Sequence, residues 1–373
     1  MKDYINKNLG LLFDTLKELC AIPAPSGQEE RRAEYCRRWL ENVGAKEVYV
    51  DEALNVILPI GCESSDRITV FVAHTDTVFP DTEPMPYEDD GKIIRCPGVG
   101  DDTASLAVLL LTAKYFVERG IRPTDGVMFV CNSGEEGLGN LKGTKRLFED
   151  YKGRIGRFVS FDSNIRHIVD RCVGSHRYEV TVRTEGGHSF ARFGSANAIA
   201  RLSVLICDLY SIRVPDKAGA KTTYNVGSIS GGTSVNTIAQ NATMLCEYRS
   251  DDEECLTFME EQFQAAFERA KRDDVDIEIK RIGVRPCMGH VDAIAHEKLI
   301  SICRRIIESV ANISVTRSSG STDCNIPLSL GIPAVCIGVY NGGGSHTRSE
   351  WVEKASLSTG LEIAIRAAIC LTE

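Results

Sequence analysis

The distribution of apolar residues along the chain predicts four strands that are buried on both faces. These continuous apolar runs cover residues 68–73, 127–131, 158–161 and 332–337. Predominantly apolar runs of this length are typical of central strands in a parallel sheet. Each run is followed by side chains that can bind a metal ion or support one, namely His74, Asp76, Glu135, Glu136, Asp162 and His346.

Helical periodicity dominates the N-terminal segment. Apolar residues recur at helical spacing within residues 9–19, so we expect the chain to open with an amphipathic helix that ends before Pro23. Ser26 and Glu29 form a capping-box pattern. This pattern predicts that a second helix begins there and continues through residues 31–40.

Residues 101–117 form the clearest helical pattern, and short apolar segments at 48–50 and 55–59 predict two further strands. Asp101 and Asp102 stand at the start of this helix, where the positive end of the helix dipole favours acidic side chains. The alternation of strands and helices predicts an α/β fold with a doubly wound, mostly parallel sheet.

A different pattern begins near Gly174. Alternating residues predict strands at 177–184, 222–229, 242–250 and 275–282, and helices are expected at 196–209 and 253–272. This β-α-β-β-α-β order is that of a ferredoxin-like α+β unit. A helix at 293–310, a strand at 334–339 and a helix at 355–371 then return to the parallel-sheet pattern. We therefore expect a discontinuous domain of residues 1–173 and 286–373, with a second domain of residues 174–285 inserted into it.

Composition and charge narrow the classes of function. The chain has 373 residues, of which 43% are hydrophobic and 25% charged, as expected for a globular protein of two domains. Its net charge of −9 and its scattered basic residues argue against a nucleic-acid partner. Charges throughout residues 1–20 exclude a signal peptide, and no apolar stretch approaches the roughly 18 residues that span a bilayer. We expect a cytoplasmic protein without a membrane partner, whose 14 cysteines are reduced and mostly buried.

The candidate functional residues follow the ends of the apolar runs. Ligands of open α/β sheets bind beyond the carboxyl ends of the strands, so histidines and carboxylates at that edge predict a metal site. Asp76 lies two positions after His74 and can either face the site or hold the His74 ring from behind. Of Glu135 and Glu136, we expect one to bind metal and the other to take a proton from a metal-bound water. The whole set suits two borderline cations that share one carboxylate.

Some of these residues have simpler interpretations. Asp101 and Asp102 can be N-capping residues, although the glycines before them suggest a sharp bend that positions Asp101. Asp162 can be a turn residue at the end of a strand. Four histidines lack any such context and are expected to be surface or packing residues, namely His167, His176, His290 and His296.

In combination, the motifs resemble the co-catalytic dizinc exopeptidases, a family that includes peptidase T, carboxypeptidase G and the aminoacylases. The matching segments are His74-Thr75-Asp76, Gly100-Asp101-Asp102, Gly134-Glu135-Glu136-Gly137, Phe161-Asp162 and Ser345-His346-Thr347. Their order is that of the family, and the inserted domain lies where the family has a lid and dimerisation domain. Ser321-Thr322-Asp323-Cys324-Asn325-Ile326-Pro327 and His346-Thr347-Arg348-Ser349-Glu350 look most like the peptidase T branch. Thr103 departs from the basic residue or glycine that relatives often have after the acidic pair.

The resemblance implies a role for each position. His74 and Asp162 would hold one metal ion, Glu136 and His346 the other, and Asp101 would bridge them. Asp76 would orient His74, Glu135 would be the general base and acid, and the Asp101–Asp102 peptide bond would be cis. In the lid, His188 looks like the residue that stabilises the oxyanion, which dimeric members supply from the partner subunit. Asn236 and Arg249 resemble the groups that hold a substrate carboxylate. A turn histidine, a loop asparagine and a surface arginine are the simpler alternatives.

We therefore expect a metal-dependent hydrolase of the peptidase T type that releases the N-terminal residue of short peptides by means of a metal-bound hydroxide. The cofactors would be two Zn²⁺ per subunit, for which Co²⁺ or Mn²⁺ could substitute, and the protein would be a homodimer through its lid. An alternative is a deacylase or carboxypeptidase-like amidohydrolase that acts on N-acyl amino acids. The core motifs cannot separate the two, because they act on the scissile amide bond and not on the substrate groups on either side of it. A catalytically silent metal-binding scaffold is a remote alternative, because every expected position is occupied.

Overall fold

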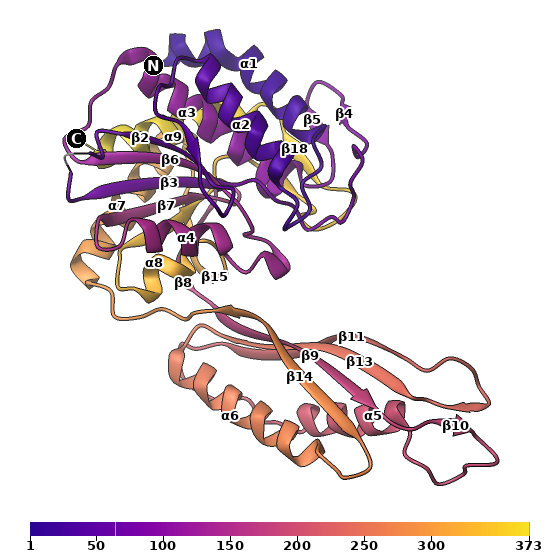
Figure 1. Ribbon diagram of the computed structural model, residues 1–373. Coiled ribbons are helices and arrows are strands. Elements are labelled where there is room, and N and C mark those ends of the chain that lie inside the picture. Colours follow the sequence, from indigo (N-terminus) through magenta and orange to yellow (C-terminus); the bar gives the residue numbers. More distant parts are fainter. Residues whose placement is uncertain (64, 373) are drawn as a thin grey trace. The chain divides into compact units, whose positions relative to one another are not determined.

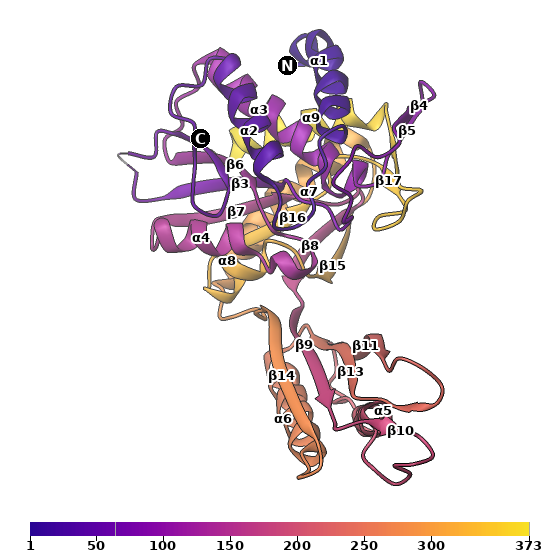
Figure 2. The ribbon, with the colours of Figure 1, turned by 45° about the vertical axis from the view of Figure 1, so that its right-hand side comes forward.

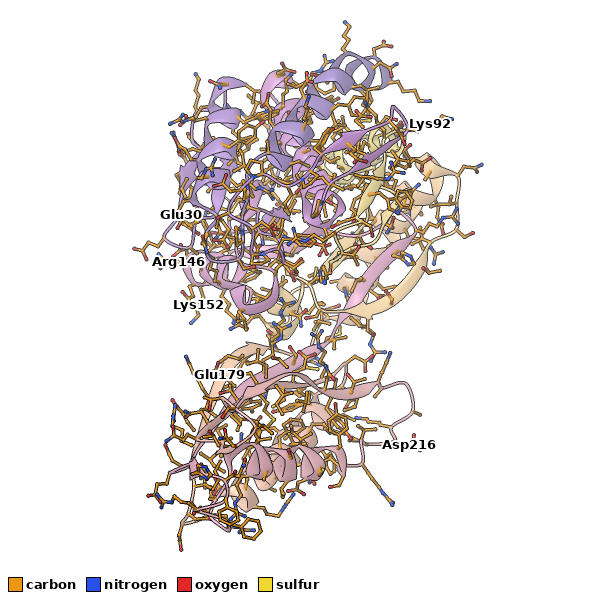
Figure 3. The ribbon with its side chains drawn as sticks, turned by 90° about the vertical axis from the view of Figure 1, so that its right-hand side faces the viewer. Glu30, Lys92, Arg146, Lys152, Glu179 and Asp216 are labelled. Atoms are coloured by element: carbon orange, nitrogen blue, oxygen red, sulfur yellow. The ribbon has the colours of Figure 1, made fainter. Side chains whose placement is uncertain are left out.

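The protein folds into two compact units along one chain (Figure 1). The computed structural model describes residues 1–63 and 65–372. Unit 1 comprises Met1–Cys172 and Gly289–Glu373, and unit 2 comprises Val173–Met288. Charged side chains of both signs, including Glu30, Lys92 and Lys152, stand at the surface of unit 1 (Figure 3). In the described part of the chain, no helix has the length and apolar character to cross a membrane.

Unit 1 is built on an eight-stranded sheet with the order β1-β2-β6-β3-β7-β16-β8-β15. The strands are β1 (Tyr49–Val50), β2 (Val56–Ile60), β3 (Ile68–His74), β6 (Gly126–Asn132), β7 (Ile155–Phe161), β8 (His167–Cys172), β15 (Thr316–Gly320) and β16 (Ala334–Ile337). The four apolar runs form its centre, where β6, β3, β7 and β16 are parallel. β2 is antiparallel to β6, and β8 is antiparallel to β16. The predicted α/β fold with a mostly parallel sheet is therefore confirmed.

Helices cover both faces of this sheet, which is why its central strands contain so few polar residues. The helices of unit 1 are α1 (Lys2–Cys20), α2 (Glu30–Asn42), α3 (Ser105–Arg119), α4 (Lys142–Asp150), α7 (Ala293–Ala311), α8 (Asn325–Ser329) and α9 (Ser356–Thr372). Phe116 of α3 packs edge to face on Phe129 of β6, with ring centroids 5.1 Å apart. Phe148 of α4 packs on Phe158 of β7 from the opposite face, at 5.8 Å. Figures 1 and 2 show α3 and α4 on opposite sides of the sheet.

The predicted capping box is wrong. α2 begins at Glu30, and no side chain caps its N-terminus. The Ser26 hydroxyl instead donates to Asp76 Oδ2 at 2.6 Å, and the Glu29 carboxylate accepts from Gly27 N and Lys142 Nζ. Tertiary partners therefore compete successfully with the local cap, because they bury both side chains against a charged or donor group.

The helix predicted from residue 101 begins later. α3 starts at Ser105, and a short π-helical turn, η1 (Val99–Ala104), precedes it. Asp101 and Asp102 have non-helical backbone angles, and the peptide bond between them is cis, as the resemblance implied. The N-capping interpretation of these two acids is therefore wrong, because their side chains bind other groups.

Several short elements escaped the sequence pattern. β8, β15 and α4 were not predicted, nor was a small antiparallel sheet with the order β17-β18-β5-β4. Its strands are β4 (Glu88–Asp89), β5 (Ile93–Arg95), β17 (Gly342–Gly343) and β18 (Trp351–Glu353). The strands of this small sheet have two or three residues each and are too short for any periodicity to register. This sheet fixes both ends of the loop that carries His346.

Unit 2 is an antiparallel sheet with two helices on one face. Its sheet order is β11-β13-β9-β14, formed by β9 (Gly174–Arg183), β11 (Thr222–Gly231), β13 (Asn241–Ser250) and β14 (Asp276–Arg285). The helices are α5 (Ala198–Tyr210) and α6 (Glu253–Ala270). Tyr248 of β13 packs on Phe263 of α6 with ring centroids 4.7 Å apart. The predicted β-α-β-β-α-β order is confirmed, and the short pair β10 (Gly187–His188) and β12 (Thr237–Ile238) is an addition to it.

Candidate metal centre

The carboxyl ends of three neighbouring parallel strands bring the candidate ligands together. His74 is the last residue of β3 and is in register with Asn132, the last residue of β6. Glu135 and Glu136 follow β6, and Asp162 follows β7, which lies on the other side of β3. Strand ends that meet at one edge of a sheet hold their side chains on a rigid base. His346 reaches the same edge from the loop between β17 and β18, with a positive φ of 64°.

Asp101 lies between the two histidines. Its Oδ1 is 3.1 Å from His74 Nε2, and its Oδ2 is 3.1 Å from His346 Nε2. His346 Nε2 is also 3.1 Å from Glu136 Oε1. Two ligand atoms that share one tetrahedral zinc ion lie roughly 3.4 Å apart, because each is about 2.1 Å from the metal. The separations at Asp101 therefore suit a carboxylate that binds one ion through each oxygen.

Among the residues that the structure describes, three groups of side chains each offer ligand atoms within 4.8 Å of one another. One group contains His74, Asp102 and Asp162, and a second contains His74, Glu135 and Glu136. The third contains Asp101, Glu136 and His346. All the predicted ligand positions thus converge, and Asp102 joins them although it was not predicted. Asp102 Oδ2 also accepts from the backbone N–H of His74 at 2.9 Å.

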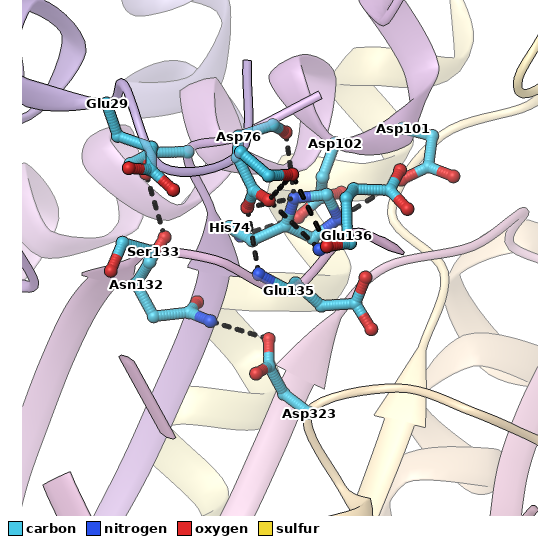
Figure 4. A network of polar contacts seen from close by, with 12 residues as sticks. Glu29, His74, Asp76, Asp101, Asp102, Asn132, Ser133, Glu135, Glu136 and Asp323 are labelled. Carbon is cyan, nitrogen blue, oxygen red and sulfur yellow. Dashed lines mark hydrogen bonds and ion pairs between the residues drawn. The ribbon is translucent and has the colours of Figure 1, made fainter. Parts of the chain in front are cut away.

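Asp76 lies behind the site and is fully buried. Its carboxylate accepts from the backbone N–H groups of Glu135 and Glu136, both at 2.9 Å (Figure 4). His74 Nδ1 is 3.0 Å from the backbone oxygen of Asp76 and 3.4 Å from its Oδ1. A proton on Nδ1 satisfies these acceptors and leaves Nε2 free to bind a metal. Of the two positions considered for Asp76, the structure therefore shows the one behind the ring.

The pKa values of several groups in the site are shifted, because buried carboxylates lie close together there. Burial raises the pKa of Glu136 to about 7, although the bond to His346 opposes the rise. Burial and the charge of Asp101 raise the pKa of Asp162 above its ordinary value. Hydrogen bonds with Asp101 and Glu136 raise the pKa of His346 to about 10. A bound cation relieves such crowding, because it stabilises every carboxylate that contacts it.

Glu350 holds the turn that presents Asp101. Its carboxylate accepts from the backbone N–H groups of Gly98, Gly100 and Asp101 at 2.7, 2.9 and 2.7 Å. A Cβ at position 100 would lie 2.9 Å from Glu350 Oε1, so the glycine is required there. Sequence reasoning assigned Glu350 no role, because its partners are backbone groups about 250 positions away. The sequence offered only the likeness of residues 346–350 to one branch of a family.

Two further residues behind the site were missed. Ser26 donates to Asp76, as described above. Asp323 is 1% exposed and accepts from the side chains of Asn132 and Thr144. Burial, followed by the charge of Glu135, raises the pKa of Asp323 to about 6. The sequence offered only the likeness of residues 321–323 to one branch of a family.

The three predicted substrate contacts all lie in unit 2. His188 is in β10, and the adjacent Ser189 N–H donates to the backbone oxygen of Asn236 at 3.0 Å. His188 Nδ1 accepts from the Phe190 N–H at 3.3 Å, which leaves the ring proton on Nε2. Arg249 lies near the end of β13 and binds Glu247 through Nε at 2.7 Å. The structure thus brings His188 and Asn236 together at one tip of unit 2, whereas Arg249 lies toward the opposite end of β13.

Comparisons with known proteins agree with this fold. A family model described as peptidase family M20/M25/M40 matches residues 70–369. A succinyl-diaminopimelate desuccinylase from Corynebacterium glutamicum is 24% identical over 362 residues, covering 94% of this chain and 95% of the relative. The aminopeptidase PepT from Bacillus cereus has a TM-score of 0.70 at 20% identity, covering 96% of this chain and 98% of its own. The YXEP protein of Bacillus subtilis, a dinuclear metal-binding peptidase, has a TM-score of 0.64 at 16% identity and covers 100% of each chain.

Proposed function

The chain belongs to peptidase family M20/M25/M40, and from that premise we propose that it is a dizinc exopeptidase that acts on short peptides, most like a tripeptide aminopeptidase. The observation that carries the proposal is Asp101, whose two carboxylate oxygens each lie 3.1 Å from a different histidine. The shared fold with an aminopeptidase PepT supports the choice of peptide substrates.

The donor set fits two divalent cations. Imidazole and carboxylate ligands suit Zn²⁺, and they also suit Co²⁺ or Mn²⁺. His74 and Asp162 would hold one ion, Glu136 and His346 the other, and Asp101 would bridge both. When bound, such ions lower the pKa of a coordinated water toward about 7 and polarise the scissile carbonyl. The dinuclear metal-binding peptidase with the same fold supports this arrangement.

The chain's own groups would carry the proton transfers and hold the substrate. Glu135 would take the proton from the attacking water and deliver it to the leaving amine. Asp76 would keep the His74 ring oriented with Nε2 toward the metal. His188, with its proton on Nε2, is in the form that can donate a hydrogen bond to the oxyanion. Arg249 would bind the substrate carboxylate, for which the guanidinium fork is suited. Because Asn236 lies at the opposite end of unit 2, it would reach that carboxylate, together with His188, from the partner subunit.

We propose that the enzyme is a cytoplasmic homodimer, with residues 174–285 as the lid through which the subunits associate. Unit 2 carries large apolar side chains that are almost fully exposed, namely Phe190 at 89%, Phe193 at 93% and Val235 at 103%. Exposed apolar groups of this size are typical of surfaces that another molecule covers. Sedimentation velocity at micromolar concentration should report a dimer, and a monomer would contradict this part of the proposal.

A second candidate function is the hydrolysis of N-acyl amino acids. The relative from Corynebacterium glutamicum is a succinyl-diaminopimelate desuccinylase and matches 94% of this chain. The residues at the candidate metal centre handle the amide bond in both reactions, so they favour neither. The choice depends on the groups that flank that bond.

One experiment tests the function and separates the candidates. The purified protein is analysed for metal and then assayed on di- and tripeptides beside N-acetyl, N-succinyl and N-carbamoyl amino acids. Release of the N-terminal residue from tripeptides supports the aminopeptidase, and preferential cleavage of an acyl amino acid supports the deacylase. A protein loaded with two equivalents of zinc that cleaves nothing in the panel would favour the catalytically silent scaffold.

A further inference from the structure

The proposed base Glu135 and the proposed metal ligand Glu136 lie on one loop whose two ends are close together. Glu135 and Glu136 belong to residues 133–141, here called the Glu-pair loop, which joins β6 to α4. Within it, Leu141 N–H donates to Gly134 O at 2.8 Å, and Gly139 N–H donates to Glu136 O at 2.7 Å. Both acids nevertheless project from backbone that lies outside the sheet. Asp76 holds the backbone N–H groups of both acids, and the course of the rest of the loop depends on what holds its two ends.

Asp323 contacts both of these ends. The Asn132 side-chain amide, at the end of β6, donates to Asp323 Oδ2 at 2.6 Å (Figure 4). The Thr144 hydroxyl, in the first turn of α4, donates to Asp323 Oδ1 at 2.5 Å. One buried carboxylate thus accepts a hydrogen bond from each end of the Glu-pair loop, through a different oxygen.

Asn55 joins the same two ends at the backbone. Its Oδ1 accepts from Ser133 N–H at 3.2 Å, and its Nδ2 donates to Gly143 O at 2.9 Å. A Cβ at position 143 would lie 2.3 Å from Asn55 Oδ1, so the contact requires a glycine there. The base of the loop is therefore bound by two buried side chains from distant segments of the chain.

We propose that Asp323 is a positioning residue that fixes Glu135 and Glu136 by holding both ends of the Glu-pair loop. The inference rests on the proposed function for what those two acids do. Partners that orient metal ligands from behind typically change metal affinity or activity by about 10–100-fold when they are removed. The hydrogen bonds, and not the charge of Asp323, are the proposed cause.

Three variants test the proposal. D323A removes both hydrogen bonds, and T144V removes one of them at nearly constant volume. D323N removes the charge, but its amide oxygen can still accept from Thr144. If the Asn132 side-chain amide rotates by 180°, the amide nitrogen of residue 323 in D323N can donate to Asn132 Oδ1. This oxygen is free to accept, because it has no hydrogen-bond partner within residues 1–63 and 65–372. D170A is the matched control, because Asp170 of β8 is 3% exposed and binds Arg317 of β15, outside the Glu-pair loop.

Two readouts require no substrate. The first is hydrogen–deuterium exchange in peptides that cover residues 133–143. The second is zinc affinity, measured by competition with a chromogenic chelator. We expect faster exchange and about 10-fold or greater loss of zinc affinity in D323A. T144V should show a smaller change in the same direction, and D323N and D170A should stay near the wild type.

The activity readout adds a third comparison under saturating zinc. Loss of positioning in D323A should lower kcat more than it changes KM, because the loop carries the proposed base and not the groups that bind the ends of the substrate. The proposal is overturned if D323A matches D170A in exchange and affinity. It is equally overturned if D323N loses as much as D323A, since the charge would then be responsible. If the wild type cleaves no substrate in the panel, the proposed function fails, whereas the exchange and zinc readouts still test Asp323.

Discussion

Glu350 binds the backbone N–H of Asp101 at 2.7 Å, although the two residues lie 249 positions apart. The same carboxylate accepts hydrogen bonds from the backbone N–H groups of Gly98 and Gly100, so it satisfies three donors of one tight turn. This contact links the loop that carries His346 to the turn that presents Asp101. The geometry of the candidate bridging ligand therefore depends on a side chain outside the ligand set.

Glu350→Gln should weaken metal binding. The amide keeps one acceptor oxygen but turns a donor toward backbone N–H groups, so the turn must move. We expect zinc affinity to fall by about 10–100-fold, as measured by chelator competition. Glu353→Gln is the control, because Glu353 is exposed and should bind zinc like the wild type. Equal affinity in the two variants would show that the turn does not need the Glu350 carboxylate.

Glu135→Ala should abolish hydrolysis and leave metal content intact. The side chain is proposed to transfer protons and not to hold a metal, so its loss should lower kcat by about 10²–10⁴-fold. The measurement is turnover of a tripeptide, paired with metal analysis of the same sample. Glu136→Ala serves as the comparison and should lose metal as well as activity. Retained turnover in Glu135→Ala would remove this residue from the mechanism.

Ser26→Ala should destabilise unit 1. The Ser26 hydroxyl donates to Asp76 Oδ2 at 2.6 Å, and Asp76 is fully buried. A hydrogen bond to a buried charged group contributes about 1.5–3 kcal/mol, so the free energy of unfolding should fall by that amount. Urea denaturation followed by tryptophan fluorescence measures it. Ser358→Ala removes an exposed hydroxyl on α9 and should change the free energy little; a comparable loss in both variants would contradict the role given to Ser26.

The stability of unit 2 should fall in acid because of His176. Burial lowers the pKa of this imidazole, Arg281 lowers it further, and Glu260 opposes both. The folded state therefore favours the neutral ring. The resulting stability is present above the unfolded pKa of about 6.5 and is lost as the pH falls through the lower folded pKa.

The test of this pH effect is His176→Gln. Urea denaturation followed by circular dichroism at several pH values between 5 and 8 should show a weaker pH dependence in this variant than in the wild type. His290→Gln, at an exposed position of unit 1, is the control and should keep the wild-type slope. An unchanged slope in His176→Gln would assign the acid sensitivity to other groups.

The sequence by itself determined the architecture. Strands such as β3 and β6 are buried along their whole length, and a run of apolar residues reports this directly. The alternating strands of unit 2 are equally readable, because one face of the sheet meets α5 and α6. The residue types at the strand ends, including His74 and Asp162, were also visible. Burial and side-chain period are local properties, so a local pattern is enough to predict them.

Only the tertiary structure decided which polar groups meet. Ser26 and Glu29 matched a helix cap, yet one binds Asp76 and the other Lys142. Asp101 matched a helix start, yet it faces two histidines that lie far from it in the chain. A hydrogen bond depends on distance and angle to a single partner, and the folded chain supplies that partner from any position. No periodicity in the sequence predicts such a contact, which is why the partners of Glu350 and Asp323 became visible only in the fold.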